Sequence, residues 1–254
     1  CHQKEKSLAV NGSLVDFAMG HFFYGLHRED EKWIFREWAP NATAIYLTGT
    51  FNNWKEKPAY EMRRINKQGD WEITLPLSSM NHGDLYKLSV HWHGGKGERI
   101  PSYATRLEQD DVTKIFSAQV WSPPEPYKWK TEDFRPEKNA PVIYEAHIGM
   151  ATEEYRTGTY REFTRDIIPY IAKAGYNTIQ LMAIQEHPFY GSFGYHVSSF
   201  FAASSRFGYP EDLKELIDSA HASGIRVIMD LVHSHSVKNV NEGLGLFDGS
   251  PGQY

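Results

Sequence analysis

The stretch that decides the fold runs from Gln185 to His235 and reads QEHPFYGSFGYHVSSFFAASSRFGYPEDLKELIDSAHASGIRVIMDLVHSH. Its final part, Arg226 to Val232, is a short apolar run just after Gly224, typical of a buried parallel strand. Polar residues follow at the strand's carboxyl end, where α/β folds bind their ligands. Asp230 and His235 are therefore candidate binding residues. The alternative interpretation is a turn residue at a strand end and an ordinary loop histidine.

The neighbouring segments alternate between strand and helix patterns. Strands are predicted at 143–148, 178–183 and 226–232. Thr159 and Glu162 form a capping-box pattern that opens the first helix, and Pro169 is expected to kink or restart it. The second helix is predicted from Pro210 to Gly224. Three strands with two intervening helices indicate the opening of a (β/α)8 barrel.

Residues 184–209 form a connection of 26 residues without helical periodicity. Connections of this length are usually functional. The segment contains Gly194-Tyr195-His196 and Phe207-Gly208, which together with the following DLVHSH resemble the α-amylase clan. The longer wordings at 144–150, 182–208 and 243–250 resemble glycogen or starch branching enzymes of the eukaryotic type.

The resemblance implies 1,4-α-glucan branching: cleavage of an α-1,4 link and transfer of the chain to a glucose 6-hydroxyl by a retaining double displacement. It implies that His235 donates a hydrogen bond to a glucose hydroxyl and that Tyr195 stacks on the same glucose. Asp230 matches a carboxylate that pairs with an arginine located beyond Tyr254. His196 stands where many amylases carry Asp and branching enzymes often carry His or Gln. Tyr209 stands where relatives tend to have a capping Thr.

The resemblance assigns no catalytic nucleophile or acid to this chain. In the clan these carboxylates follow the fourth and fifth barrel strands, and neither strand is recognisable before Tyr254. Glu145, Glu186 and Asp230 lie at strand ends but do not match those positions. The sequence is therefore interpreted as an amino-terminal fragment with the catalytic carboxylates outside it.

A second, all-β domain is predicted upstream. The expected organisation is a lead-in at 1–24, an immunoglobulin-like β-sandwich at 25–120, a linker at 121–141 and an incomplete barrel at 142–254. The sandwich strands are expected at 32–38, 44–50, 70–75, 85–91 and 115–120. In the lead-in, the possible hydrophobic anchors are Leu8, Leu14, Phe17 and Met19.

Residues 36–54, REWAPNATAIYLTGTFNNW, resemble the starch-type carbohydrate-binding module that precedes the barrel in such enzymes. Trp38 is the first candidate for holding glucan, with Trp54 and Trp71 behind it. Trp38 shares a strand face with Arg36, which favours contact with water. The alternative is that each tryptophan fills the core.

The composition of the chain limits the classes of binding partner that it is expected to have. The formal charge of −5 and isoelectric point near 6.2 give no electrostatic footprint for nucleic acid or an anionic membrane. The single cysteine, Cys1, cannot form an internal disulfide, which fits a reducing, cytoplasmic location. An amino-terminal cysteine can also carry a lipid, which nothing else in the sequence supports. No transmembrane-length apolar run is present.

Metal binding is the alternative use of the same motif, since Asp230, His233 and His235 are possible ligands. No fourth ligand stands at a matching spacing, so no cofactor or metal is expected. Two other functions remain open: a hydrolase of the same clan, and a glucan-binding protein without activity. The expected partner in all three is an α-1,4-glucan such as glycogen, amylose or starch.

Overall fold

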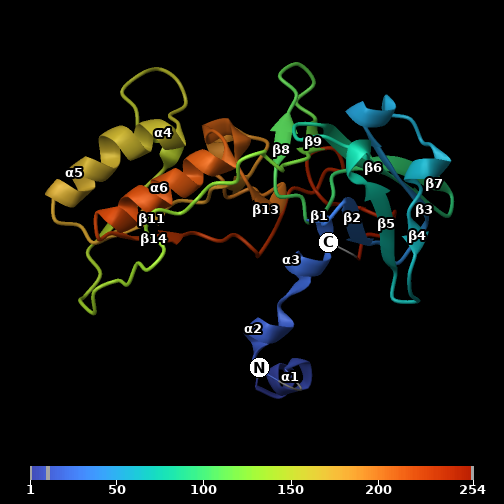
Figure 1. Cartoon of the computed structure of the whole chain (residues 1–254), viewed down its shortest axis with the longest axis horizontal. Helices are drawn as coiled ribbons and strands as arrows, with labels where there is room; N and C mark the ends of the chain where they lie inside the picture. The colour runs from blue at the N-terminus through green and yellow to red at the C-terminus, as the bar shows by residue number, and fades with distance from the viewer. Residues whose placement is uncertain (1, 10–11, 253–254) are drawn as a thin grey trace.

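A computed structural model describes residues 2–9 and 12–252 of the chain. Figure 1 shows two halves: a group of antiparallel strands from β1 to β9, and a smaller group in which helices cover a parallel sheet. Cys1 lies outside the described residues. No helix in the described residues is both long and apolar enough to cross a membrane.

The first half is a sandwich of two antiparallel sheets. One sheet has the order β1-β2-β5-β4, formed by Gly25–Glu29, Lys32–Trp38, Asp70–Pro76 and Arg63–Arg64. The other has the order β3-β6-β9-β8, formed by Ala42–Gly49, Leu85–Trp92, Phe116–Gln119 and Leu107–Gln109, and β7 (Gly95–Arg99) pairs with β6. The five predicted strands are present. The short strands β1, β4, β7 and β8 were not predicted because they carry no sustained apolar alternation.

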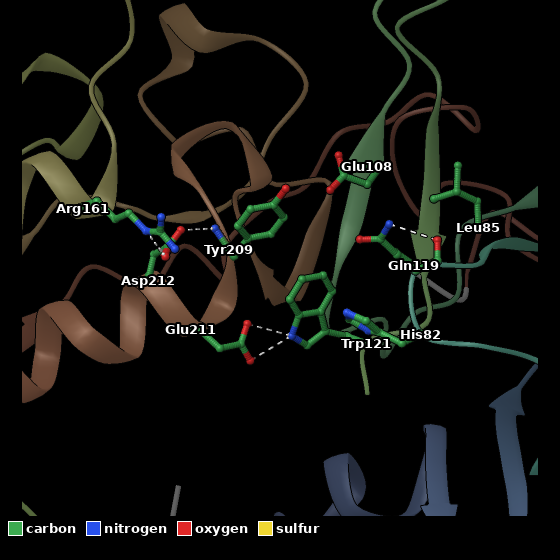
Figure 2. A pocket seen from close by; sticks show the side chains of 10 residues that line it. His82, Leu85, Glu108, Gln119, Trp121, Arg161, Tyr209, Glu211 and Asp212 are labelled. Carbon is green, nitrogen blue, oxygen red and sulfur yellow. Dashed lines mark hydrogen bonds and ion pairs between the residues drawn. The ribbon is translucent and has the colours of Figure 1, made fainter. Parts of the chain in front are cut away.

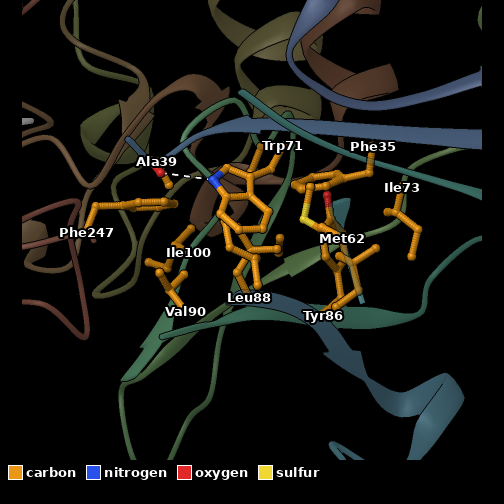
Figure 3. Packing of buried hydrophobic residues seen from close by; sticks show 14 of the residues in the cluster. Phe35, Ala39, Met62, Trp71, Ile73, Tyr86, Leu88, Val90, Ile100 and Phe247 are labelled. Carbon is orange, nitrogen blue, oxygen red and sulfur yellow. Dashed lines mark hydrogen bonds between the residues drawn. The ribbon is translucent and has the colours of Figure 1, made fainter. Parts of the chain in front are cut away.

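The core of the sandwich lies between the two sheets. Alternate residues of β2 and β5 point inward, among them Phe35, Trp71 and Ile73. They meet Leu88 and Val90 of β6, as Figure 3 shows.

Residues from the second half complete this core. Ala202, Leu244 and Phe247 belong to the same buried cluster, and Phe247 is fully buried in it. Arg99 of β7 donates to the backbone oxygens of Leu246 and Phe247, at 2.9 and 3.0 Å. The sandwich core therefore extends into the second half, while the parallel sheet and its helices pack around a separate core that includes Phe163, Ile179 and Leu216.

The second half is built on three parallel strands in the order β10-β11-β14, formed by Ile143–Ala146, Thr178–Leu181 and Arg226–Met229. Both strand pairs are parallel, with Gln180 opposite Glu145 on one side and Ile228 on the other. Together with the sandwich, this is the fold class predicted from the sequence: a β-sandwich followed by the first strands of a (β/α)8 barrel.

The first connecting helix is divided by its proline, as expected. It consists of α4 (Tyr160–Glu162), a π-helical stretch η5 (Phe163–Ile167) and α5 (Ile168–Lys173), with Pro169 in the first turn of α5. Thr159 and Glu162 form the predicted capping box. Gly175 follows the helix with φ of 83°.

The second connecting helix, α6, runs from Pro210 to Ala222. Its N-cap, Tyr209, makes no side-chain capping bond, as predicted; instead the Asp212 carboxylate accepts from the Tyr209 N–H at 2.9 Å. Residues 184–209, which precede α6, contain a hairpin of β12 (Gln185–Glu186) and β13 (Ser199–Ala203).

Residues 121–141 lie along α6. Trp121 donates its indole N–H to Glu211, and the Asp218 carboxylate accepts from the Tyr127 hydroxyl and from two backbone N–H groups. Phe134 stacks on His221, with ring centroids 4.1 Å apart. The segment is thus held along one face of the helix.

The amino-terminal residues form three short helices, α1 (His2–Leu8), α2 (Leu14–Phe17) and α3 (Gly20–Phe23). Figure 1 shows them extending away from the sandwich. Leu14, Phe17 and Met19 are 41%, 57% and 45% exposed, so their predicted role as buried anchors is wrong. The remaining short turns are η1 (Thr50–Asn52), η2 (Pro58–Tyr60), η3 (Leu77–Ser79), η4 (Ile148–Met150), η6 (Tyr190–Ser192) and η7 (Ser205–Phe207).

Candidate functional site

A hydrogen-bonded cluster occupies the carboxyl ends of β11 and β14. The Tyr195 hydroxyl donates to Asp230 Oδ2 at 2.6 Å, and the Gln180 amide donates to Asp230 Oδ1 at 2.9 Å. The two donors fix the carboxylate plane in the place where the sequence predicts a ligand site. Asp230 and Tyr195 are half-buried, so both remain within reach of a bound molecule.

His235 completes the cluster. Its Nε2 donates to the backbone oxygen of Tyr195 at 2.7 Å, and its Nδ1 pairs with the Ser234 hydroxyl at 2.9 Å. A backbone oxygen only accepts, so Nε2 carries the proton. Donation to a sugar hydroxyl from Nε2 therefore requires exchange or sharing of the bond to Tyr195. His196 is exposed, with its ring centroid 6.4 Å from that of His235.

The Tyr195 hydroxyl stays protonated over a wide pH range. Partial burial, followed by the hydrogen bond to Asp230, raises the pKa of Tyr195 to about 12. At neutral pH the phenol is a hydrogen-bond donor and holds Asp230 in its acceptor role.

The backbone around Gly194 sets the position of Tyr195. Gly194 has φ of 86°, and a Cβ at this residue would lie 1.8 Å from the backbone oxygen of Ala183, two residues after the end of β11. Only glycine fits this close approach. The loop is thereby pressed onto β11, and the next residue, Tyr195, is directed toward Asp230.

A buried carboxylate ties the two ends of this loop together. Glu186 is fully buried and accepts hydrogen bonds from Ser204 and from the hydroxyl and N–H of Ser205, at 2.7 to 2.9 Å. Burial is the first cause that raises the pKa of Glu186. The residue braces the loop, and no ligand can reach it. Glu145, by contrast, is an exposed residue of β10.

The three candidate tryptophans of the sandwich differ in exposure. Trp54 is 39% exposed, and the Lys87 ammonium lies 5.8 Å from its ring centroid. Trp38 is half-buried, and its indole N–H donates to the Gln68 oxygen at 2.9 Å. Trp71 is only 5% exposed and donates to the Ala39 oxygen inside the core. Burial of Trp71 argues against the predicted glucan contact, because its ring has no open face.

Sequence reasoning missed Gln180, the second donor to Asp230. Its signal was a polar side chain near the end of the otherwise apolar run TIQLMA at 178–183. His233, one of the considered metal ligands, places its ring edge-on to Phe200 at 5.3 Å. Within the described residues, no three His, Cys, Asp or Glu side chains are grouped as a metal site.

Two family profiles match the chain, one in each of its structural halves. The profile of carbohydrate-binding module 48 (isoamylase N-terminal domain) matches residues 23–104. The profile of the alpha amylase catalytic domain matches residues 150–243, which include the whole Tyr195–Asp230–His235 cluster.

Relatives match along nearly the whole chain. A 1,4-alpha-glucan-branching enzyme of Yarrowia lipolytica is 47% identical over 99% of this chain, and one of Emericella nidulans is 45% identical over 96%. The chain is homologous to the 1,4-alpha-glucan-branching enzymes. The enzyme of Saccharomyces cerevisiae, 44% identical, is a further fungal homologue, so the predicted resemblance to branching enzymes of the eukaryotic type is confirmed. The chain spans 38% of the length of the Yarrowia enzyme and 37% of the other two.

Solved structures of more distant proteins share the fold of this branching-enzyme homologue. A pullulanase from Bacillus acidopullulyticus aligns over 91% of the chain and 32% of its own, with a TM-score of 0.72 and 20% identity. The GBS pullulanase SAP aligns over 85% of the chain and 34% of its own, with a TM-score of 0.66 and 21% identity. At these identities the likeness establishes the arrangement of sandwich and barrel strands alone.

Proposed function

We propose that the protein carrying this chain is a 1,4-α-glucan branching enzyme that works on glycogen, amylose or starch in the cytoplasm. It cleaves an α-1,4 link, holds the cleaved chain covalently and transfers it to a glucose 6-hydroxyl. The observation that carries the proposal is the Tyr195–Asp230–His235 cluster at the strand ends. Its support from comparison is the fungal homologues, which match nearly the whole chain.

The cluster holds the sugar next to the cleaved bond. His235 donates to a glucose hydroxyl, and Tyr195 presents its ring to the same glucose. The Tyr195 hydroxyl and Gln180 fix Asp230 by hydrogen bonds of 2.6 and 2.9 Å. Asp230 is thus ready to receive the arginine that the resemblance implies. Orientation of this kind lowers the barrier by positioning rather than by bond-making.

The sandwich retains the polymer in the same proposal. Trp38 and Trp54 are its two tryptophans from the predicted set with accessible ring surface. Aromatic rings and carbohydrate C–H faces are complementary apolar surfaces. Retention of a long glucan near the barrel would raise the local concentration of chains at the cluster.

The test measures two quantities while the whole protein acts on amylose: the number of α-1,6 links and the number of reducing ends. Transfer predicts new α-1,6 anomeric signals by proton NMR while the number of reducing ends stays nearly constant. His235→Ala should slow the reaction by about 10²-fold or more, because a donor aimed at the reacting sugar is lost. Reducing ends that rise in step with cleavage, without α-1,6 signal, would make the protein a hydrolase.

His233→Ala is the matched control for His235→Ala. His233 is an exposed histidine two positions away whose ring contacts Phe200 and not the cluster. Its removal should leave the transfer rate within a few-fold of the parent. Equal losses in the two variants would contradict the role of His235. A protein that binds amylose but changes neither signal would be a glucan-binding protein without activity.

A further inference from the structure

A cavity lies between the sandwich and the start of the barrel, lined by residues of both. It has a volume of about 770 Å³. Its wall combines Gln119 of β9, Trp121 of the linker and Tyr209 at the start of α6, as Figure 2 shows. None of Tyr195, Asp230 and His235 lines it. The proposed reaction therefore makes no use of this cavity.

Two parallel aromatic rings form one side of the cavity. The rings of Trp121 and Tyr209 are 17° apart in orientation, with centroids 5.7 Å apart. The Arg106 guanidinium carbon lies 5.1 Å from one centroid and 5.2 Å from the other. Its side chain is 3% exposed and donates to the Gly208 oxygen at 2.6 Å, which holds the ring pair in place. Tyr209 is 53% exposed. The wall is thus rigid and open to solvent.

Hydrogen-bonding groups surround the rings. The Glu211 carboxylate accepts from the Trp121 indole N–H at 3.1 Å and keeps further lone pairs free for a ligand. His82 Nδ1 accepts from the Ser122 N–H at 3.1 Å, so the neutral imidazole carries its proton on Nε2. Gln119 Oε1, behind this surface, is buried and has no hydrogen-bond partner among the residues that the structure describes. The cavity therefore offers Glu211 as an acceptor and His82 Nε2 as a donor.

The charges of the lining restrict the ligand. Each of the three lining carboxylates is already paired with a cation: Asp212 with Arg161 at 2.6 Å, Glu108 with Arg106, and Glu211 with Lys214 at 3.8 Å. A phosphate or carboxylate ligand would therefore have to compete with these carboxylates for the cations. A neutral molecule with apolar faces and many hydroxyl groups matches both the rings and the acceptors.

Tyr209 occupies an N-cap position that it does not cap. Its side chain makes no hydrogen bond to the first turn of α6, whereas Ser, Thr, Asp or Asn at this position would stabilise the helix. The chain thus carries an exposed ring where a shorter polar residue would serve the fold better. A tyrosine at this position is explained if the ring contacts a ligand.

We propose that the Trp121–Tyr209 cavity binds a short segment of neutral α-1,4-glucan, separate from the glucan held at the reaction cluster. The ring pair stacks on glucose C–H faces, and Glu211 accepts from glucose hydroxyls. The choice of an α-1,4-glucan among neutral sugars rests on the proposed function. A chain held here is anchored on both halves of the molecule at once.

The test uses the whole protein labelled with 5-fluorotryptophan and observed by fluorine NMR. The Trp121 resonance is identified by its absence in Trp121→Phe. Titration with maltotriose should shift this resonance saturably, and titration with inorganic phosphate should not. Tyr209→Thr should weaken maltotriose binding at Trp121 by about 10-fold or more, because one stacking partner is lost.

Tyr209→Thr separates binding from folding. Threonine supplies the missing cap, so the thermal midpoint of the variant should equal or exceed that of the parent. Tyr170→Ala is the matched control: Tyr170 is 61% exposed on α5 and does not line the cavity, so its loss should leave the titration unchanged. An unshifted Trp121 resonance, or equal affinity in Tyr209→Thr, would overturn the proposal.

Two parallel measurements distinguish failure of this inference from failure of the proposed function. If cellotriose shifts the Trp121 resonance as strongly as maltotriose, the preference for an α-1,4-glucan is wrong. Branching by the control Tyr170→Ala at saturating amylose should stay within about two-fold of the parent, since Tyr170 lines neither the cavity nor the reaction cluster. Absence of branching in the parent would count against the enzyme assignment and leave the maltotriose titration valid.

Discussion

The burial of Glu37 makes the free energy of unfolding depend on pH. Glu37 sits on β2 beside Trp38, is completely buried, and accepts from the N–H and hydroxyl of Ser102 at 2.8 and 2.5 Å. Burial outweighs these hydrogen bonds and raises the pKa of Glu37 from 4.5 to about 7.

The raised pKa predicts that this residue stabilises the fold least at neutral pH. Between pH 4.5 and 7 the folded chain keeps a proton that the unfolded chain has lost, so the free energy of unfolding falls as pH rises. The loss is up to about 3 kcal/mol, at about 1.4 kcal/mol for each pKa unit. Urea denaturation at pH 4.5 and at pH 7 should show this fall in the free energy of unfolding for the parent and a smaller fall for Glu37→Gln. An equal fall in the two proteins would contradict the raised pKa of Glu37.

At the scale of single residues, the sequence predicted residues that belong to recognisable motifs, but it did not predict which side chains are buried by packing. Tyr195, Asp230 and His235 were predicted from recognisable sequence motifs, and the structure brings them into one hydrogen-bonded cluster. Their contacts with glucan stay predictions. The predicted glucan contact of Trp71 disagrees with its burial, because the local sequence around a strand tryptophan is the same whether that strand face is exposed or buried. Its burial follows from the packing of this face of β5 against the second sheet, which no local pattern reveals.

The segment that follows β14 contributes to the stability of the sandwich. Phe247 from this segment is fully buried in the sandwich core, as Figure 3 shows. Phe247→Ala should lower the free energy of unfolding by about 3–5 kcal/mol, because it leaves a cavity among residues of both halves. Chemical denaturation measures the change.

Leu246→Ala is the neighbouring control. Leu246 is 45% exposed, so the substitution should change the free energy of unfolding by no more than about 0.5 kcal/mol. Similar losses in the two variants would mean that the segment, rather than the Phe247 ring, supplies the stability.

At the scale of elements, the sequence predicted strands and helices that carry a strong period. β2 begins and ends at its predicted residues, Lys32 and Trp38, and α6 begins at Pro210. The β12–β13 hairpin was missed because one of its strands has two residues and the pairing shifts register. The π-helical stretch η5 was likewise not predicted, because the helical pattern used assumes 3.6 residues per turn.

For the molecule as a whole, the parallel sheet predicts the behaviour of residues 1–254 in isolation. β10 and β14 each have one unpaired edge in the described structure, and Ile143, Ile228 and Met229 on them are 42% to 49% exposed. The isolated piece should be poorly soluble, because open edges pair between molecules. It should also show no branching of amylose, since the resemblance places the nucleophile and acid elsewhere. Branching by purified residues 1–254 would refute that placement.

The whole molecule was the scale at which the sequence was least informative. The proline-rich stretch 121–141 has the pattern of a plain linker, yet hydrogen bonds of Trp121 and Asp218 hold it against α6. Trp121 also lines a cavity. Such contacts join residues about 90 positions apart in the chain. Local propensity carries no information about them.

The contact between β7 and the segment after β14 limits how these proteins can exchange parts. Arg99 binds the backbone of Leu246 and Phe247, and the Asn41 N–H donates to the Asp248 carboxylate at 2.8 Å. A chimaera that grafts a foreign carbohydrate-binding module onto this barrel would leave the Phe247 ring without its pocket. Recombination between homologues should therefore succeed only when the module and residues 244–248 come from the same parent.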